Sequence, residues 1–448
     1  MCGDFAERFM LTTLLVAIVF IRPSQSYREP CPPSCWCMKV TAVKCTDSQL
    51  DGVPSDLNSN LTSLDISRNN LTSLPEDAFQ ETPGLRHLRL ASNRIAEIHK
   101  DAFSVLFNLS SVALQDNRIT TLHPDSFINT SLRVLHLSWN NLVLPERGPF
   151  IQSASLERLY LDHCNISYLP DEIFINSTNI TSLKINGNSI KSINDQVFRP
   201  LSQLIFISIA QNELVTLHPD TFRYNNQLLQ VDLTGNTIHI PEDSFLRSTV
   251  NFISLGSNGI THLPENTFRD LSRVETLFLH NNSISDLDIK VWKYLPKLTD
   301  LMLFNNNITS FDPNVFSENT ELQRLYLRNN ILKFDEGPIL NTSKLILLDI
   351  RSCNLSYLPP NAFDGMPSIQ VLALSENNFE DIDINLFDTL KKLNHINISD
   401  NPAVCSCVNE QLRTWAFQRN INLKTYCTGG ELSKEICNDV APSSKQTA

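Results

Sequence analysis

The chain lacks the short motifs that accompany most catalytic chemistry. Its ten histidines are scattered and form no H-E-x-x-H zinc motif, and its 12 glycines form no phosphate-binding loop. The stretch Gly256-Ser257-Asn258-Gly259 does not have the spacing of a nucleophile elbow. The formal net charge of -12 disfavours nucleic acids and other polyanions as partners, because these require a basic surface. We therefore predict a protein that is not an enzyme and that uses no cofactor or metal.

Long hydrophobic runs are also scarce. The run from Met10 to Ile21 is too short to span a membrane and ends before Ser24-Gln25-Ser26, a small-x-small cleavage pattern. No later stretch approaches the roughly 18 to 20 apolar residues of a membrane helix. The final NDVAPSSKQTA resembles neither an anchor nor a glycolipid signal. These features predict a signal peptide over residues 1–26, a disordered tail over 439–448, and secretion to the extracellular space or matrix without membrane insertion.

An internal repeat occupies most of the chain. The template L-x-x-L-x-L-x-x-N-x-L occurs fifteen times, in steps of 22 to 24 residues. The copies begin at Leu61, Leu85, Leu109, Leu132, Leu156, Ile180, Leu204, Leu228, Val250, Val274, Leu298, Leu322, Leu345, Ile369 and Leu393.

The spacing of the leucines predicts the architecture. Apolar residues at the first, fourth and sixth positions fit a short strand that alternates inward apolar and outward variable side chains. A return segment, usually L-P-x-x-x-F, follows each strand and ends at residues such as Phe79, Phe103 and Phe127. No single copy can bury its own leucines, so the copies must stack into a solenoid with one continuous core and one buried column of phenylalanines.

From Cys31 to Cys437 the chain resembles the secreted extracellular leucine-rich repeat proteins. The resemblance implies an α/β solenoid in the form of a horseshoe, with a curved parallel β-sheet on the concave face, irregular or short-helix returns on the convex face, and a disulfide-rich cap at each end. The implied organisation is an N-terminal cap over 27–60, about fifteen repeats over 61–401 and a C-terminal cap over 402–438.

Two repeats carry cysteine at the ninth position, where the others have asparagine. In the family that this chain resembles, the ninth residue forms hydrogen bonds with backbone groups of neighbouring turns. Cys164 and Cys353 lie eight repeats apart. Strands stacked at about 4.8 Å would separate them by roughly 35 to 40 Å, whereas a disulfide needs Cα atoms within about 7 Å. We therefore expect two buried structural thiols rather than a disulfide or a reactive site.

Apart from Cys2 in the predicted leader, the other cysteines cluster at the two ends of the repeat array. Four of them in the spacing C-x3-C-x-C-x7-C fit either a disulfide cap or a zinc knuckle, and the predicted leader favours disulfides. The family resemblance implies the pairs Cys31–Cys37 and Cys35–Cys45. It also implies Cys405–Cys427 and Cys407–Cys437, although the nine residues between Cys427 and Cys437 are fewer than the family usually has.

Twelve N-x-S/T sequons agree with a secretory route, although chance produces some in an asparagine-rich chain. They lie at Asn60, Asn70, Asn108, Asn129, Asn165, Asn176, Asn179, Asn281, Asn307, Asn341, Asn354 and Asn397.

The variable positions of the strands are the candidates for ligand binding, because the repeat does not fix their residue types. The third, fifth and seventh positions should project from the concave face, mostly as small or polar side chains, but repeats ten to thirteen bring aromatic, methionine and arginine side chains together. Such clusters are typical of binding hot spots; alternatively, the rings merely stabilise the sheet by about 0.2 to 1 kcal/mol per pair. This aromatic–arginine patch consists of Phe278, His280, Met302, Phe304, Arg324, Tyr326, Arg328 and Arg351.

A second cluster, the histidine–tyrosine patch, lies on repeats four to six. Shared ancestry of two halves of the chain explains its similarity to the first patch as well as a binding role does. It consists of His136, Trp139, Arg158, Tyr160 and Lys184.

Three hypotheses about function remain open at this point. The first is a secreted, non-catalytic module that binds an extracellular protein ligand or receptor on its concave face. The second is a carrier subunit that stabilises a circulating enzyme or hormone complex, and the third is a truncated receptor ectodomain. The repeat specifies the scaffold and not the ligand, and it does not determine the oligomeric state.

Overall fold

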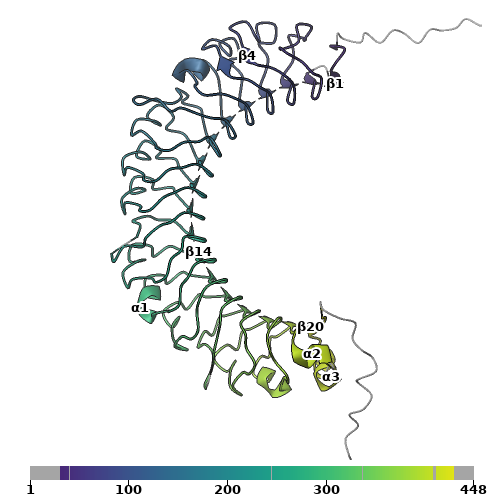
Figure 1. Ribbon diagram of the computed structural model, residues 1–448, viewed down its shortest axis with the longest axis vertical. Helices are drawn as coiled ribbons and strands as arrows, with labels where there is room; N and C mark the ends of the chain where they lie inside the picture. Colours follow the sequence, from purple (N-terminus) through teal and green to yellow (C-terminus); the bar gives the residue numbers. More distant parts are fainter. Residues whose placement is uncertain (1–30, 40, 244, 335, 407–409, 428–448) are drawn as a thin grey trace, which may run out of the picture.

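Short parallel strands line the inner side of a horseshoe, and irregular segments form its outer side (Figure 1). The computed structural model describes residues 31–39, 41–243, 245–334, 336–406 and 410–427. The predicted signal peptide and C-terminal tail lie outside these residues. The predicted solenoid fold is confirmed within them.

The main sheet has 18 strands, of which β1 and β2 precede the first repeat and β20 follows the last. Each of the fifteen repeats therefore contributes one strand, as the template predicts. The strands of the main sheet are β1 (Trp36–Lys39), β2 (Ala42–Lys44), β3 (Ser63–Asp65), β5 (His87–Arg89), β7 (Ser111–Ala113), β8 (Val134–His136), β9 (Arg158–Tyr160), β10 (Ser182–Lys184), β11 (Phe206–Ser208), β12 (Gln230–Asp232), β13 (Phe252–Ser254), β14 (Thr276–Phe278), β15 (Asp300–Met302), β16 (Arg324–Tyr326), β17 (Leu347–Asp349), β18 (Val371–Ala373), β19 (His395–Asn397) and β20 (Asn422–Lys424).

The register of the sheet keeps equivalent repeat positions side by side. Leu277 of β14 pairs with Leu301 of β15, and Phe278 pairs with Met302. All the neighbouring pairs run parallel except β1 and β2, which are antiparallel. The central residue of each repeat strand is a leucine, isoleucine or valine that is buried in the core, so its two neighbours must point to the concave face.

The outer side is built from turns and a few short helices. Two-residue strands β4 (Ser73–Leu74) and β6 (Glu97–Ile98) pair in a second small sheet. The helical segments are the 3-10 helices η1 (Pro124–Phe127) and η2 (Ile384–Phe387) and the α-helices α1 (Ile289–Trp292), α2 (Pro402–Ser406) and α3 (Glu410–Gln418).

The predicted column of rings runs through the core behind the sheet. Phe103 and Phe127 are fully buried and stack with ring centroids 4.8 Å apart, and Phe198 and Phe222 stack at 5.4 Å. Trp292 of α1 takes the place of a phenylalanine and packs edge-on against Phe316 at 5.4 Å. These rings are part of the core, and none of them is available to a ligand.

The ninth-position asparagines connect successive repeats. Asn188, for example, donates from Nδ2 to the carbonyl oxygens of Leu161 and Ile185 at 2.9 and 3.1 Å. Its Oδ1 accepts from the backbone N–H groups of Cys164 and Ile166, both at 2.9 Å. One side chain therefore satisfies four backbone groups that the irregular turns would otherwise leave buried and unpaired.

Cys164 and Cys353 are buried free thiols, as predicted. Each sulfur lies 3.3 Å from the backbone carbonyl oxygen of the preceding repeat, that of Leu137 or Leu327. Burial raises the pKa of both thiols to about 12, and both therefore stay protonated at neutral pH.

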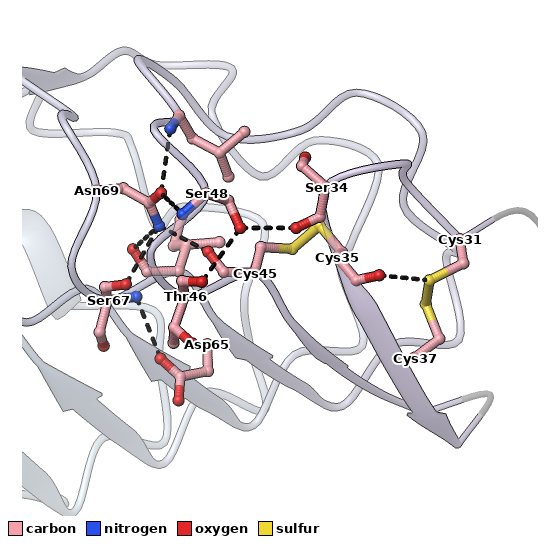
Figure 2. Close-up of a disulfide and its surroundings, with 12 residues drawn as sticks. Cys31, Ser34, Cys35, Cys37, Cys45, Thr46, Ser48, Asp65, Ser67 and Asn69 are labelled. Atoms are coloured by element: carbon pink, nitrogen blue, oxygen red, sulfur yellow. Dashed lines mark hydrogen bonds between the residues drawn. A yellow bond between two sulfur atoms is a disulfide. The ribbon is translucent and has the colours of Figure 1, made fainter.

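The segment before the first repeat, predicted to be the N-terminal cap, has the predicted disulfides Cys31–Cys37 and Cys35–Cys45 (Figure 2). Disulfide pairing of all four cysteines contradicts the alternative of a zinc knuckle. Asn69 of the first repeat donates to the carbonyl oxygen of Cys45 at 2.7 Å and accepts from the N–H of Ser48 at 2.9 Å. The asparagine ladder thus reaches the segment before the first repeat.

The last strand of the sheet, β20, lies beyond the last repeat and pairs with β19. Helix α3 carries Trp415, whose ring packs 5.4 Å from Phe387 and so closes the column of rings. Cys427 is disulfide-bonded. The side chains of Cys405, Cys407 and Cys437 lie outside the described part of the chain, so the two pairings predicted here stay predictions.

Candidate binding surface

The residues of the aromatic–arginine patch lie on strands β14 to β17 and directly after them, and these strands are neighbours in the sheet on the inner side of the horseshoe (Figure 1). The fifth-position residues Phe278, Met302 and Tyr326 lie directly beside one another in the sheet register. All three are partly exposed. The structure therefore brings together the residues that the repeat template grouped.

A stack of rings forms the centre of the patch. The imidazole of His280 and the ring of Phe304 are nearly parallel, with centroids 4.7 Å apart. The guanidinium of Arg328 lies over the ring of Phe304, 4.5 Å from its centroid. Phe278 packs edge-on against His280 at 5.8 Å. Aromatic and cation–π contacts of this kind fix the side chains and reduce the entropy that a ligand must remove on binding.

Gly256 leaves room for the stacked ring of His280. A Cβ built on Gly256 would lie 2.5 Å from Cε1 of His280, closer than two carbon atoms that are not bonded to each other can approach. Gly256 holds the seventh position, next to His280 in the same column. The repeat template does not distinguish this residue, because small residues are common at the positions that face the concave side.

Two of the three arginines in the patch are engaged in ion pairs. Arg324 forms a forked pair with Asp300, in which Nη2 lies 2.7 Å from Oδ2. Arg351 forms a similar pair with Asp349, at 2.8 Å for both contacts, and the Asp349 side chain is only 3% exposed. Hydrogen bonding to these carboxylates raises the pKa of both arginines.

Burial also affects the titration of the neutral groups in the patch. Partial desolvation lowers the pKa of His280, and the nearby charge of Arg328 lowers it further, against an opposing effect of Asp232. Desolvation raises the pKa of Tyr326. At neutral pH the patch therefore presents uncharged rings together with three guanidinium groups.

The histidine–tyrosine patch is also assembled, on β8 to β10. The rings of His136 and Tyr160 lie 5.0 Å apart, and Nζ of Lys184 lies 5.8 Å from the Tyr160 ring. At the strand exits Trp139 stacks on His163 at 4.0 Å. A Cβ on Gly187 would meet the His163 ring, so a second glycine makes room for a second stack.

Sequence reasoning missed two residues that extend these patches toward each other. Phe252 packs edge-on against Phe278 with centroids 4.9 Å apart, and Lys184 lies 5.7 Å from the ring of Phe206. Both phenylalanines occupy the third position of their strands. Aromatic residues at the third position are therefore the sequence signal for both.

Two further properties bear on the kind of site. No group of three or more metal-ligating His, Cys, Asp or Glu side chains occurs among the residues that the structure describes. None of the described helices combines the length and the apolar character that crossing a bilayer requires.

Comparison with known proteins identifies the repeat. The family model described as "Leucine rich repeat" matches residues 59–110, 107–166, 167–238, 248–304, 272–332 and 343–402, more than half of the chain. Leucine-rich repeat-containing protein 3 of Danio rerio is 34% identical over 85 residues, which are 18% of this chain and 30% of the relative. Leucine-rich repeat-containing G-protein coupled receptor 4 of Bos taurus is 43% identical over 68 residues, 15% of this chain and 7% of the receptor.

The relatives therefore match only locally. Nyctalopin of Mus musculus is 36% identical over 88 residues, 18% of each protein. The chain spans less than a third of the length of these curated relatives. A chain from a structure of the Toll–Spatzle complex of Drosophila superposes with a TM-score of 0.64 over 84% of this chain and 60% of that chain. At 20% identity this likeness shows the fold alone.

Proposed function

Because the chain belongs to the leucine-rich repeat family, we propose that it is a secreted, non-catalytic module that binds an extracellular protein ligand on its concave face. The aromatic–arginine patch is the binding site in this proposal. The observation that carries it is the stack of His280, Phe304 and Arg328, which is ordered by its own contacts and still open to a partner on the concave face. Rigid aromatic and arginine side chains are the groups from which most binding hot spots are made.

The position of the patch disfavours a purely structural role for its rings. Rings that only stabilise the fold belong in the buried column, which already contains a phenylalanine or an equivalent apolar residue from nearly every repeat. The patch adds aromatic groups on the opposite side of the sheet, where they remain partly in water. Apolar surface held in water has a cost that a ligand would relieve.

A receptor ectodomain is the alternative that the comparisons favour. The local 43% identity to a leucine-rich repeat-containing G-protein coupled receptor supports it. In this alternative the same concave face binds the ligand, and the chain is one part of a longer membrane protein. The carrier-subunit hypothesis stays open, and no comparison favours it.

The experiment that tests the proposal is a comparative capture. The full chain is expressed as a secreted protein and used as bait on extracellular fractions, next to the variant Phe278→Ala/Tyr326→Ala. Tyr160→Ala in the histidine–tyrosine patch is the matched control, and circular dichroism checks that all three are folded. A protein retained by the wild type and by Tyr160→Ala, but lost by the double variant, supports the proposal. Equal retention by all three would place the site elsewhere and refute it.

A further inference from the structure

The arginines of the aromatic–arginine patch are not equivalent, and their difference indicates what the patch binds. Arg324 and Arg351 each form a forked pair with an aspartate of the same sheet. These two carboxylates, Asp300 and Asp349, are themselves nearly buried. Both pairs are therefore complete within the protein, and neither arginine needs a partner.

Arg328 has no such carboxylate. Its guanidinium is positioned by the face of Phe304 at 4.5 Å, and no described residue forms an ion pair with it. A ring face attracts the cation but leaves the N–H groups at the edge of the guanidinium free to donate. The fork of an arginine matches a carboxylate in a bidentate pair.

We propose that Arg328 receives an acidic side chain of the protein ligand, whose flanking apolar residues lie on Phe278, Phe304 and Met302. This inference rests on the proposed function, because it assigns the chemistry of the ligand at the same patch. The pairing would replace water around a guanidinium that is already held in place, so little side-chain entropy is lost on binding.

The surroundings favour a single carboxylate over a polyanion. A sulfated polysaccharide or a nucleic acid needs several unpaired cations in a row. Here the neighbouring guanidinium groups of Arg324 and Arg351 are already neutralised by aspartates, and the whole chain has a net charge of -12. One unpaired arginine among aromatic side chains fits one aspartate or glutamate in an otherwise apolar segment.

The test is a selection of peptides followed by a double-mutant cycle. A random 12-residue peptide library is selected on the full secreted chain, on Arg328→Gln and on Arg158→Gln, an exposed arginine of the other patch. We expect the wild type and Arg158→Gln to enrich peptides with one Asp or Glu flanked by apolar residues. Arg328→Gln should lose the acidic preference. Changing that acid to its amide should weaken binding to the wild type about tenfold or more, and binding to Arg328→Gln hardly at all.

Each other outcome overturns a specific part of the proposal. Peptides that require Phe278, as tested with Phe278→Ala, but show no acidic preference would refute the inference about Arg328 and leave the proposed function standing. Competition by heparin at the same affinity would make the site a polyanion site and refute it as well. Peptide binding that is indifferent to both Phe278 and Arg328 would refute the inference together with the proposed function.

Discussion

At the scale of single residues, two cysteines take a position that is otherwise reserved for asparagine. Cys164 and Cys353 are followed by Asn165 and Asn354, and these asparagines have positive φ angles of 58° and 59°. The N–H of each cysteine donates to Oδ1 of the asparagine in the next repeat, Asn188 or Asn377, at 2.9 Å. The two cysteines thus replace asparagine at one position of the ladder.

This arrangement predicts unreactive thiols. With a pKa of about 12, only about one thiol in ten thousand is ionised at pH 8, and the thiolate is the reactive form. A thiol reagent added to the folded protein at pH 8 should therefore leave Cys164 and Cys353 unlabelled, and the same reagent in denaturant should label both. Peptide mass spectrometry measures the result. Rapid labelling of either cysteine without denaturant would show that its surroundings open in solution.

Gly256 provides a second prediction at this scale. Alanine at this position would collide with the His280 ring, so Gly256→Ala should destabilise the fold by about 1 to 3 kcal/mol. Adding His280→Ala removes the collision, and the double variant should be more stable than the sum of the two single effects predicts. Thermal unfolding measures each variant, with Gly52→Ala as control because nothing lies near its Cβ position. Additive effects would mean that His280 does not cause the strain.

At the scale of the repeat, the sequence predicts the strand, the asparagine ladder and the buried ring. It does not predict the backbone between them. The eighth position has a positive φ angle in all fifteen repeats, from Arg68 at 57° to Asp400 at 55°. Gly187 and Gly235 favour this conformation, and asparagines such as Asn281 tolerate it. Trp139 rarely adopts a positive φ angle, so its residue type does not predict the conformation.

The candidate binding surface was predictable only in part, for a related physical reason. The template fixes which columns face inward, and so Phe278, Tyr326 and Arg328 were found. The difference between paired and unpaired arginines depends on side-chain reach across the sheet, as in the contact between Arg324 and Asp300. Such contacts leave no periodic signal in the sequence.

The asparagine ladder predicts a large effect of a single deletion. Asn188→Ala would leave the N–H groups of Cys164 and Ile166 buried without an acceptor. We expect a loss of about 3 kcal/mol in the free energy of unfolding. Asn226→Ala, at an exposed site on the outer side, is the matched control and should change little. Denaturant titration followed by circular dichroism compares the two, and equal stabilities would argue that water replaces the ladder.

Three partly buried histidines on the concave face predict that the stability of the fold depends on pH. Burial lowers the pKa of His136, His280 and His395 below the ordinary value of about 6.5. The unfolded chain then binds protons first as the pH falls, so the stabilising contribution is complete above about pH 6.5 and is lost as the pH falls through the folded-state values. Unfolding free energies measured between pH 7.5 and 5.5 should fall less steeply in His136→Gln/His280→Gln. Exposed His262→Gln is the control, and parallel curves for all three proteins would contradict the assignment.

At the scale of the whole molecule, the distribution of sequons divides the horseshoe into sectors. Seven sequons lie between Asn60 and Asn179 and five between Asn281 and Asn397, whereas residues 180–280 contain none. The free sector includes Phe206 and Phe252, which extend the two patches toward each other. Under the proposed secretory route, no glycan would attach to residues 180–280, and this middle sector of the solenoid would stay open to a large partner.

This arrangement predicts where an added glycan interferes. Gln230→Asn/Asp232→Thr creates a sequon on β12, at an exposed position between Phe206 and Phe252 in the register of the sheet. A glycan there should abolish binding of the captured ligand, because it would stand in the open sector of the concave face while every aromatic side chain remains in place. Gln196→Thr creates the matched sequon at Asn194 on the outer side, and a glycan there should leave binding unchanged. Binding is measured before and after enzymatic removal of the glycans, which should restore it only in the β12 variant. Unimpaired binding with the β12 glycan in place would mean that the ligand approaches from another side of the solenoid.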